Sequence, residues 1–217
     1  LKEKELRKDR YDLYLDIIES SSLQILSVVS DLIDIARIDE GQFQLSYDRI
    51  DLDALLDEME ELYRIRLKAL NKDHISFNII KGKGRNREII SDSSRLKQIL
   101  NNLIGNSIKF TNAGQIEFEY TLNANKLNFM VKDTGIGIPV HWQKTVFDRF
   151  QQVQDAITDS RTGTGLGLPI SKAFVELLGG EIWLESIEKV GTTFYFTIPY
   201  KIASEKVENT QELTIKT

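Results

Sequence analysis

The sequence predicts an α+β fold, a two-layer sandwich in which helices cover one face of a mixed, mainly antiparallel sheet, preceded by a long bundle helix. Helical and strand-like periodicities alternate along the chain in the order helix, strands, helix, strands, helix, strands. Two pairs of strand-like runs are separated by short turns, which favours antiparallel hairpins. No regular β–α–β alternation is visible, so an all-parallel sheet is not expected.

Composition narrows the class of protein. The 217 residues suit one large or two small domains, and 41% are hydrophobic, which is enough for a core. The net charge of −5 argues against nucleic acid as a partner. The absence of cysteine excludes disulfides, thiolate zinc sites and a cysteine nucleophile. No apolar run is long enough to span a bilayer. The sequence begins at Leu1 and not with a methionine, so we expect a piece of a longer protein.

A long helix is predicted over residues 8–40. Its apolar positions recur every seven residues, with a second series four residues later that is broken at Ser22. The two series are Tyr11, Ile18, Ile25 and Leu32, and Leu15, Val29 and Ala36. One helix cannot bury such a stripe alone, so a helical partner is expected. The alternative is that the stripe packs on the chain's own globular domain.

The remaining periodicities predict a strand-like connector and then a sandwich. In order, we expect a connector at 42–50, a helix at 51–71, strands at 75–79 and 88–91, a helix at 92–111, strands at 115–122 and 126–133, a short helix at 140–147, a helix from about Gly167, and strands at 181–186 and 192–199. The predicted domains are therefore 1–41 for the bundle helix, 42–50 for the linker, 51–201 for the sandwich and 202–217 for a polar tail.

The helix at 92–111 carries unusual chemistry on one face. Asp92, Ser93 and Ser94 offer N-cap oxygens. Asn102, Asn106 and Lys109 lie close together on the arc opposite the apolar residues, although asparagine is a mediocre helix former. This arc is either a solvated face or a site where amide oxygens complete the shell of a Mg²⁺ ion and the lysine meets phosphates.

Asp133 ends a predicted strand on the parity of the apolar residues, so its carboxylate should point toward the core and need a partner. The exocyclic amine of adenine is a suitable donor, and a backbone amide of the following turn is the ordinary alternative. That turn, Asp133-Thr-Gly-Ile-Gly-Ile-Pro139, contains Gly135 and Gly137, which permit positive φ and close approach of a ligand.

A second glycine run, Arg161-Thr-Gly-Thr-Gly-Leu-Gly-Leu-Pro169, leads into a helix. Gly163, Gly165 and Gly167 expose amides at a helix N-terminus, which favours anions. The spacing fits neither the dinucleotide fingerprint nor the P-loop. The segment 147–162 between the two runs, anchored by Phe147 and Phe150, is either a lid over a ligand or an ordinary surface loop.

These motifs, followed by Gly191-Thr-Thr-Phe194, occur in one order. Together they resemble the catalytic ATP-binding domain of bacterial sensor histidine kinases, with the histidine-kinase/gyrase-type ATPase fold. Residues 8–40 resemble the second helix of the dimerisation and histidine-phosphotransfer domain. The resemblance covers nearly the whole chain to about residue 200.

The resemblance implies a role for each matching residue. Asn106 is expected to ligate Mg²⁺ with Asn102 nearby, Lys109 to meet phosphates, and Asp133 to read adenine. The other expected nucleotide-binding residues are Gly135, Gly137, Phe150, Gly163, Thr164, Gly165, Leu166, Gly167 and Thr192. Many members have a basic residue after the second lid phenylalanine. Gln151 and Gln152 stand there instead, and Arg149 or Arg161 are the candidates to replace it.

The resemblance also implies a reaction and its partners. The γ-phosphate of ATP would pass to a histidine and then to the receiver domain of a response regulator, within a homodimer formed through the bundle helix. The family's acceptor motif is absent, because His74 and His141 are the only histidines. We therefore expect the acceptor upstream of Leu1, and a cytoplasmic portion of a membrane-anchored sensor, with any membrane segment outside this chain.

Two other classes of protein remain open from the sequence. A gyrase- or chaperone-type ATPase would carry a water-activating glutamate at the position of Asn102, and it would leave the helix at 8–40 unexplained. A degenerate kinase that only docks partners would not need an intact Asn106, Asp133 and both glycine runs.

Overall fold

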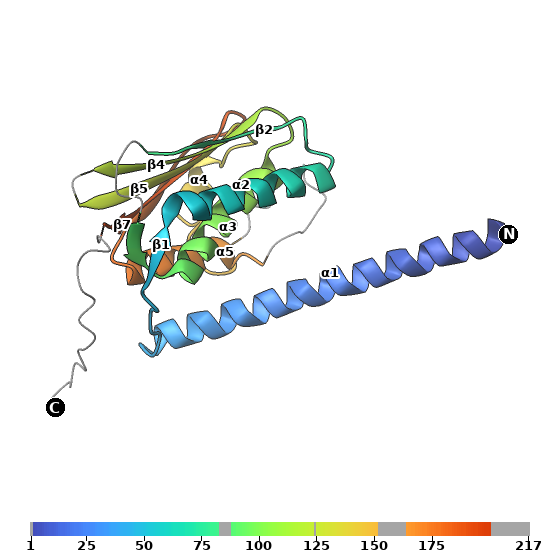
Figure 1. The fold of residues 1–217 in the computed structure, drawn as a ribbon, viewed down its shortest axis with the longest axis horizontal. Coiled ribbons are helices and arrows are strands. Elements are labelled where there is room, and N and C mark those ends of the chain that lie inside the picture. The colour runs from blue at the N-terminus through green and yellow to red at the C-terminus, as the bar shows by residue number, and fades with distance from the viewer. Residues whose placement is uncertain (1, 83–87, 124, 152–163, 201–217) are drawn as a thin grey trace.

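The chain folds into a sheet covered on one face by helices, with one long helix beside this sandwich (Figure 1). The computed structural model describes residues 2–82, 88–123, 125–151 and 164–200, except for the side chains of 2–9, 12, 13, 16 and 20. Its elements are α1 (Lys2–Asp39), β1 (Asp48–Asp51), α2 (Leu52–Ala69), β2 (Ser76–Ile80), β3 (Glu88–Ser91), α3 (Ser93–Phe110), β4 (Gln115–Asn123), β5 (Lys126–Asp133), α4 (Val140–Gln143), α5 (Gly167–Leu177), β6 (Ile182–Ile187) and β7 (Gly191–Pro199).

The five-stranded sheet has the order β2-β4-β5-β7-β6, and a separate pair joins β1 to β3. All pairs are antiparallel except β2 with β4, so the predicted mixed, mainly antiparallel sheet is confirmed. The parallel pair is a β–α–β crossover through α3. The sequence pattern hid this crossover because β3 intervenes and pairs with β1 instead.

Most predicted elements agree with the observed ones to within a few residues; the exceptions are the long helix, predicted from residue 8 but beginning at Lys2, and the short helix. We expected it over 140–147, but α4 ends at Gln143. After it, the amides of Thr145, Val146 and Asp148 bond to carbonyls three or four residues back as separate turns. The prediction was too long because isolated turns carry the same apolar spacing as a continuing helix.

The core lies between the sheet and the helical layer. Strands β4, β5 and β7 bury alternate residues, and the rings of Phe129 and Phe196 stack with centroids 4.4 Å apart. Helix α3 buries the predicted apolar arc: Leu96, Ile99, Leu100, Leu103, Ile104 and Ile108. Asp133 shares the inward parity of Phe129, and its register partners are Ile116 on β4 and Thr192 on β7. The strand period therefore delivers a carboxylate to the end of the core.

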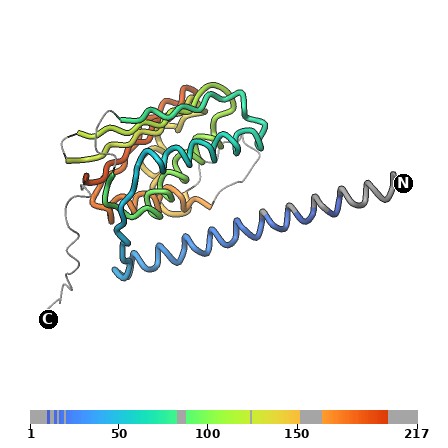
Figure 2. Tube along the Cα trace, in the orientation of Figure 1, coloured from blue at the N-terminus to red at the C-terminus, as the bar shows by residue number. Residues whose placement is uncertain are grey.

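Helix α1 meets the sandwich only near its C-terminal end. Ile35 and Asp34 are buried there, while the N-terminal part leads away from the sandwich as one unbroken helix (Figure 2). The stripe residues Tyr11, Leu15, Ile18, Ile25, Val29 and Leu32 are all exposed. Ala36 is exposed as well, so packing on the chain's own domain buries Ile35 and Asp34 but no member of the two predicted series.

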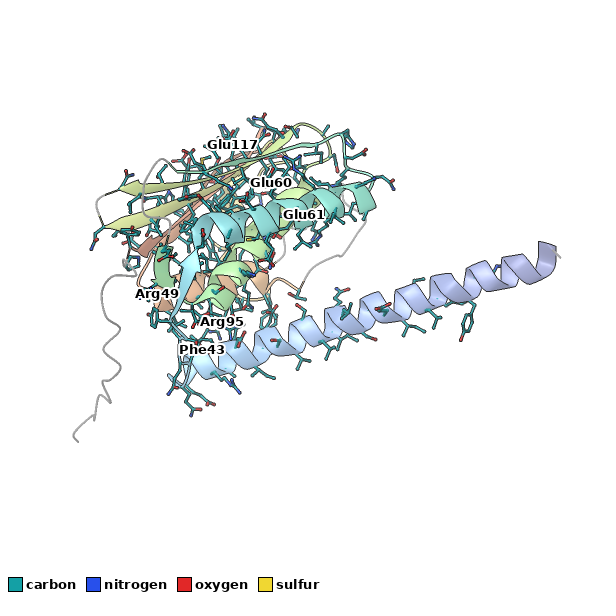
Figure 3. The ribbon with its side chains drawn as sticks, viewed as in Figure 1. Phe43, Arg49, Glu60, Glu61, Arg95 and Glu117 are labelled. Atoms are coloured by element: carbon teal, nitrogen blue, oxygen red, sulfur yellow. The ribbon has the colours of Figure 1, made fainter. Side chains whose placement is uncertain are left out.

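Arg95 of α3 is the centre of this contact (Figure 3). Its guanidinium lies 4.7 Å from the ring centroids of both Phe43 and Phe174, and it donates to the carboxylate of Asp34 at 2.8 Å. Arg95 also donates to Gln98 at 2.8 Å. A planar, weakly hydrated guanidinium is well suited to this setting between aromatic rings. The cluster joins α1, the linker, α3 and α5.

No helix in the part of the chain that the structure describes is long and apolar enough to cross a membrane.

Candidate functional site

The site is built around α3, whose start is fixed by one aspartate. Of the three predicted capping residues, Asp92 is the N-cap. Its Oδ1 accepts from the amide of Arg95 at 3.0 Å, and its Oδ2 accepts from the amide of Ser46 in the linker at 2.9 Å. The cap therefore satisfies a free amide of the first turn and ties the helix to the connector.

Asn102 joins α3 to the first turn of α5. Its Nδ2 donates to the carbonyl of Gly167 at 3.0 Å and to Oγ of Ser171 at 3.2 Å. A Cβ on Gly167 would lie 3.4 Å from Cγ of Asn102, an ordinary van der Waals contact, so this packing does not depend on the glycine. Because Nδ2 is held by α5, the side chain has a fixed orientation, and Oδ1 is the atom that remains for a ligand.

Asn106 and Lys109 continue the same face toward the C-terminal end of α3, as the sequence predicted. Asn106 is partly buried, and Nζ of Lys109 lies 4.7 Å from the ring centroid of Phe110. Partial desolvation lowers the pKa of Lys109 below that of a free lysine. This face therefore presents amide oxygens and an ammonium side by side.

The described residues contain no group of three or more His, Cys, Asp or Glu side chains that could hold a metal ion. A Mg²⁺ ion is commonly held by one or two protein oxygens together with substrate phosphates and water. The hard amide oxygen of Asn106, with that of Asn102 one turn away, fits such a site.

Asp133 lies buried at the end of β5 against Ser107 of α3, where the strand parity predicted a core-facing carboxylate. Its Oδ1 accepts from the amides of Gly135 at 2.9 Å and Thr192 at 3.3 Å, and its Oδ2 accepts from Oγ of Ser107 at 3.0 Å. The ordinary partner, an amide of the following turn, is therefore present. A carboxylate has about four acceptor positions, so a further donor can still bind at Oδ2.

The electrostatics of Asp133 combine two opposing effects. Burial disfavours the charged form and raises its pKa above the usual 3.8, while the hydrogen bonds from Gly135, Ser107 and Thr192 oppose that rise.

Ser107 is a site residue that the sequence reasoning missed. The available signal was its position as the polar residue within the buried arc of α3.

The glycines of the turn after Asp133 approach the protein's own backbone. Gly137 has a positive φ of 69°, and a Cβ there would lie 2.2 Å from the carbonyl oxygen of Ile187. A Cβ on Gly135 would lie 2.5 Å from the carbonyl oxygen of Phe110. The sequence predicted that both glycines permit positive φ and close approach: positive φ occurs at Gly137 only, and Gly135 instead allows close packing against the end of α3.

The second glycine run forms the entry to α5, and Gly163 lies outside the described residues. Oγ1 of Thr164 accepts from the amide of Leu166 at 3.2 Å, and Leu166 is buried as the N-cap residue. Gly165 has a φ of 69°, and its carbonyl accepts from the amide of Phe150 at 3.1 Å. This bond holds together the two ends of the predicted lid, most of which lies outside the described part.

The residues beside the lid contact α1. Arg149 donates twice to Asp39 of α1, at 2.7 and 2.6 Å, although both side chains are about half exposed. Phe150 is 65% exposed and has a φ of 62°, an uncommon conformation for an aromatic residue. Of the two candidates for a basic lid residue, Arg149 is thus engaged on α1, and Arg161 falls outside the described residues.

Thr192 closes the site from β7. Its amide bonds Asp133, and its Oγ1 lies 2.9 Å from Oγ of Ser186 on β6. The structure therefore joins Asp133 of β5 to Thr192 of β7 and, through Ser107, to α3, the helix that also carries Asn102, Asn106 and Lys109.

Comparison with known proteins agrees with this geometry. Residues 91–202, just over half of the chain, match the family model described as histidine kinase-, DNA gyrase B- and HSP90-like ATPase. The chain is 33% identical over 201 residues to the sensor histidine kinase WalK of Bacillus subtilis, covering 91% of this chain and 32% of WalK. It is 36% identical over 194 residues to the hybrid signal transduction histidine kinase L of Dictyostelium discoideum, covering 87% and 11%.

Solved structures show the same relationship. Full-length ShkA in complex with AMPPNP matches with a TM-score of 0.72 and 29% identity, covering 83% of this chain and 36% of ShkA. The nucleotide-free catalytic domain of the histidine kinase ThkA matches with a TM-score of 0.58 and 28% identity, covering 72% and 97%. The chain spans about a third or less of the two curated relatives named above.

The chain belongs to the histidine kinase-, DNA gyrase B- and HSP90-like ATPase family. Within that family it corresponds to the ATP-binding catalytic domain of sensor histidine kinases of two-component systems, which confirms the resemblance found in the sequence.

We predict that Asp133→Asn leaves the free protein at least as stable as the wild type at neutral pH. The pKa of Asp133 is raised on folding, so its ionised form opposes folding, and wild-type stability falls as the pH rises through the window above 3.8. The asparagine keeps an acceptor for Gly135 and Thr192 and can donate to Ser107. Urea unfolding of both proteins from about pH 4 to about pH 7 measures the difference.

The control is Asp133→Ala, which leaves two buried amides without an acceptor and should lose about 2 kcal/mol or more. A large loss of stability in Asp133→Asn at neutral pH would show that the charge itself is needed for folding.

Proposed function

We propose that this chain is the part of a sensor kinase that binds Mg-ATP and supplies the γ-phosphate to a histidine outside this sequence. The observation that carries the proposal is the buried Asp133, whose Oδ2 can accept one more donor and is bonded to Ser107 of α3, the helix that also carries Asn102, Asn106 and Lys109. The AMPPNP complex of ShkA, a structure 29% identical to this chain, supports an ATP-like ligand.

The proposed roles follow the chemistry of each side chain. Asp133 accepts from the exocyclic amine of adenine, and Lys109 neutralises phosphate charge. Asn106 offers its amide oxygen to Mg²⁺ with Asn102 beside it, and a bound Mg²⁺ offsets charge on the phosphates. The amides at the start of α5 are proposed to bind phosphate oxygens. The residues assigned there are Gly163, Thr164, Gly165, Leu166 and Gly167, with Phe150 at the lid and Gly135, Gly137 and Thr192 around Asp133.

The proposed reaction is in-line phosphoryl transfer, in which positioning and electrostatics carry most of the catalysis. A nitrogen of the acceptor imidazole forms a bond to the γ-phosphorus as the bond to the β,γ-bridging oxygen breaks, and ADP leaves. The residues of this chain hold the triphosphate in place and offset its charge. No side chain of the described part needs to take a proton from the attacking nitrogen, because neutral imidazole attacks through a free lone pair.

The proposed partners are a response regulator, which receives the phosphoryl group on an aspartate of its receiver domain, and a second copy of the kinase. The exposed stripe of α1 supports a helical partner, because a row of apolar side chains such as Ile18 and Ile25 is costly to leave in water. Because the reaction consumes ATP, we propose that this domain acts in the cytoplasm and that any membrane anchor lies in another part of the protein.

We predict that Mg-ATP binds the wild type and that Asp133→Asn binds it more weakly by about 1.5–3 kcal/mol, the range for a bond to a charged group. The asparagine amide would face the adenine amine with a donor instead of an acceptor. Titration calorimetry measures both affinities, with the exposed Asp73→Asn as the matched control. Equal affinity of Asp133→Asn and the wild type would refute the adenine assignment.

We predict that the chain binds Mg-ATP without phosphorylating its own histidines. His74 lies in the loop before β2 with Nε2 2.8 Å from the carbonyl of Asn112, and His141 is exposed on α4. Incubation with [γ-³²P]ATP should leave no acid-labile label on the protein. Label that appears on the wild type and disappears in His74→Gln/His141→Gln would contradict the prediction.

We predict that the chain self-associates through α1 as its concentration rises. Ile18 and Ile25 are 60% and 64% exposed on the stripe, so charges there should prevent association. Sedimentation equilibrium on the wild type and on Ile18→Glu/Ile25→Glu measures this, with the exposed Glu19→Gln as control. A wild type that stays monomeric at millimolar concentration would count against pairing through this stripe.

A further inference from the structure

Helix α3 ends without the left-handed residue that closes many helices. Its C-cap, Thr111, is extended, with a φ of −99° and a ψ of 121°. The last four carbonyls of a helix need partners from outside the helical pattern. The carbonyl of Ser107 accepts from the amide of Thr111 at 3.0 Å, and the carbonyl of Phe110 accepts from the amide of Ile136 at 3.2 Å. Two carbonyls, those of Ile108 and Lys109, remain.

A single lysine from a distant part of the sequence satisfies these two carbonyls. Nζ of Lys72 donates to the carbonyl of Ile108 at 2.7 Å and to that of Lys109 at 3.3 Å. Its third donor goes to the carbonyl of Thr111 at 2.7 Å. An ammonium group has three donors, and all three are used here. Its charge also lies at the negative end of the α3 dipole.

Lys72 is itself held in place by the end of α2. Asn71 adopts the left-handed conformation with a φ of 53°, and its amide donates to the carbonyl of Lys68 at 3.1 Å. The amide of Lys72 donates to the carbonyl of Leu67 at 2.8 Å, which completes a Schellman motif. The end of one helix therefore aims the lysine that closes the end of the next.

The turn that Lys72 closes contacts Asp133 and the turn that follows it, at the proposed adenine end of the site. It carries Ser107, which donates to Asp133, and Lys109, the proposed phosphate ligand. It also carries the carbonyl of Phe110, which accepts from Ile136 and against which Gly135 packs. An unravelled last turn would displace all of these groups together.

We propose that Lys72 is a positioning residue of the nucleotide site, which fixes the last turn of α3 so that Lys109 faces the phosphates and Ser107 orients Asp133. This inference rests on the proposed function, because it takes Lys109 as the phosphate contact. It assigns to the loop after α2 a role in nucleotide binding, although that loop carries none of the site motifs.

The test compares Lys72→Met with Lys72→Arg, which keeps the charge and several donors, and with Lys68→Met, an exposed lysine on α2. Titration calorimetry measures the affinity of each full chain for Mg-ADP and for adenosine, and thermal unfolding measures stability without ligand. We expect Lys72→Met to bind Mg-ADP about tenfold more weakly, with a smaller loss for adenosine, and Lys72→Arg to recover part of the affinity. Lys68→Met should match the wild type.

Lys109→Ala and the double variant Lys72→Met/Lys109→Ala separate this inference from the proposed function. If Lys72 acts through Lys109, the losses in Mg-ADP affinity will not add. Additive losses for Mg-ADP with unchanged affinity for adenosine, or a lower melting temperature with unchanged affinity for both ligands, would overturn the role of Lys72. Should Lys72→Met not fold, Lys72→Gln carries the same comparison. Unchanged affinity in Lys109→Ala would instead overturn the phosphate assignment in the proposed function.

Discussion

The site depends on one buried carboxylate and on the hydrogen-bond donors that compensate for its loss of hydration in the core. Asp133 lies at the end of an inward-facing row of β5, where a charge without partners would be very costly. Its three hydrogen bonds come from α3, from the turn that follows it and from β7, so the carboxylate also locks these three segments together. A group that holds the fold in this way is available for recognition only at the acceptor position left open on Oδ2.

On the polar face of α3, a side chain likewise bonds within the fold and leaves one acceptor atom unused. Asn102 uses its Nδ2 to join the start of α5, which leaves the amide oxygen for the proposed ligand. Asn106 makes no such structural bond among the described residues. The two asparagines, which look equivalent in the sequence, therefore differ in what a substitution would disturb: the helix–helix contact at Asn102, and the ligand face alone at Asn106.

The contact between α1 and the sandwich reaches close to the site. Arg95 pairs with the buried Asp34 of α1 and packs on Phe174 of α5, while Arg149 near the lid pairs with Asp39. The Arg95 pair is shielded between aromatic rings, whereas the Arg149 pair is exposed and screened by solvent, so it adds little to stability. The position of α1 is thus set mainly by the Arg95 cluster. The start of α5 in turn contacts Asn102 of α3.

The sequence by itself determined the fold class and most element boundaries, because these follow from local periods of 3.6 and 2, and its contiguous motifs predicted the residues of the proposed ligand face. It did not reveal Ser107, the crossover between β2 and β4, or the closure of α3 by Lys72, which lies 36 residues before Ile108. Nor did it show whether the turn glycines face a ligand or backbone. Those features depend on which segments meet in space, and hydrogen bonds between distant segments leave no periodic trace in a single sequence.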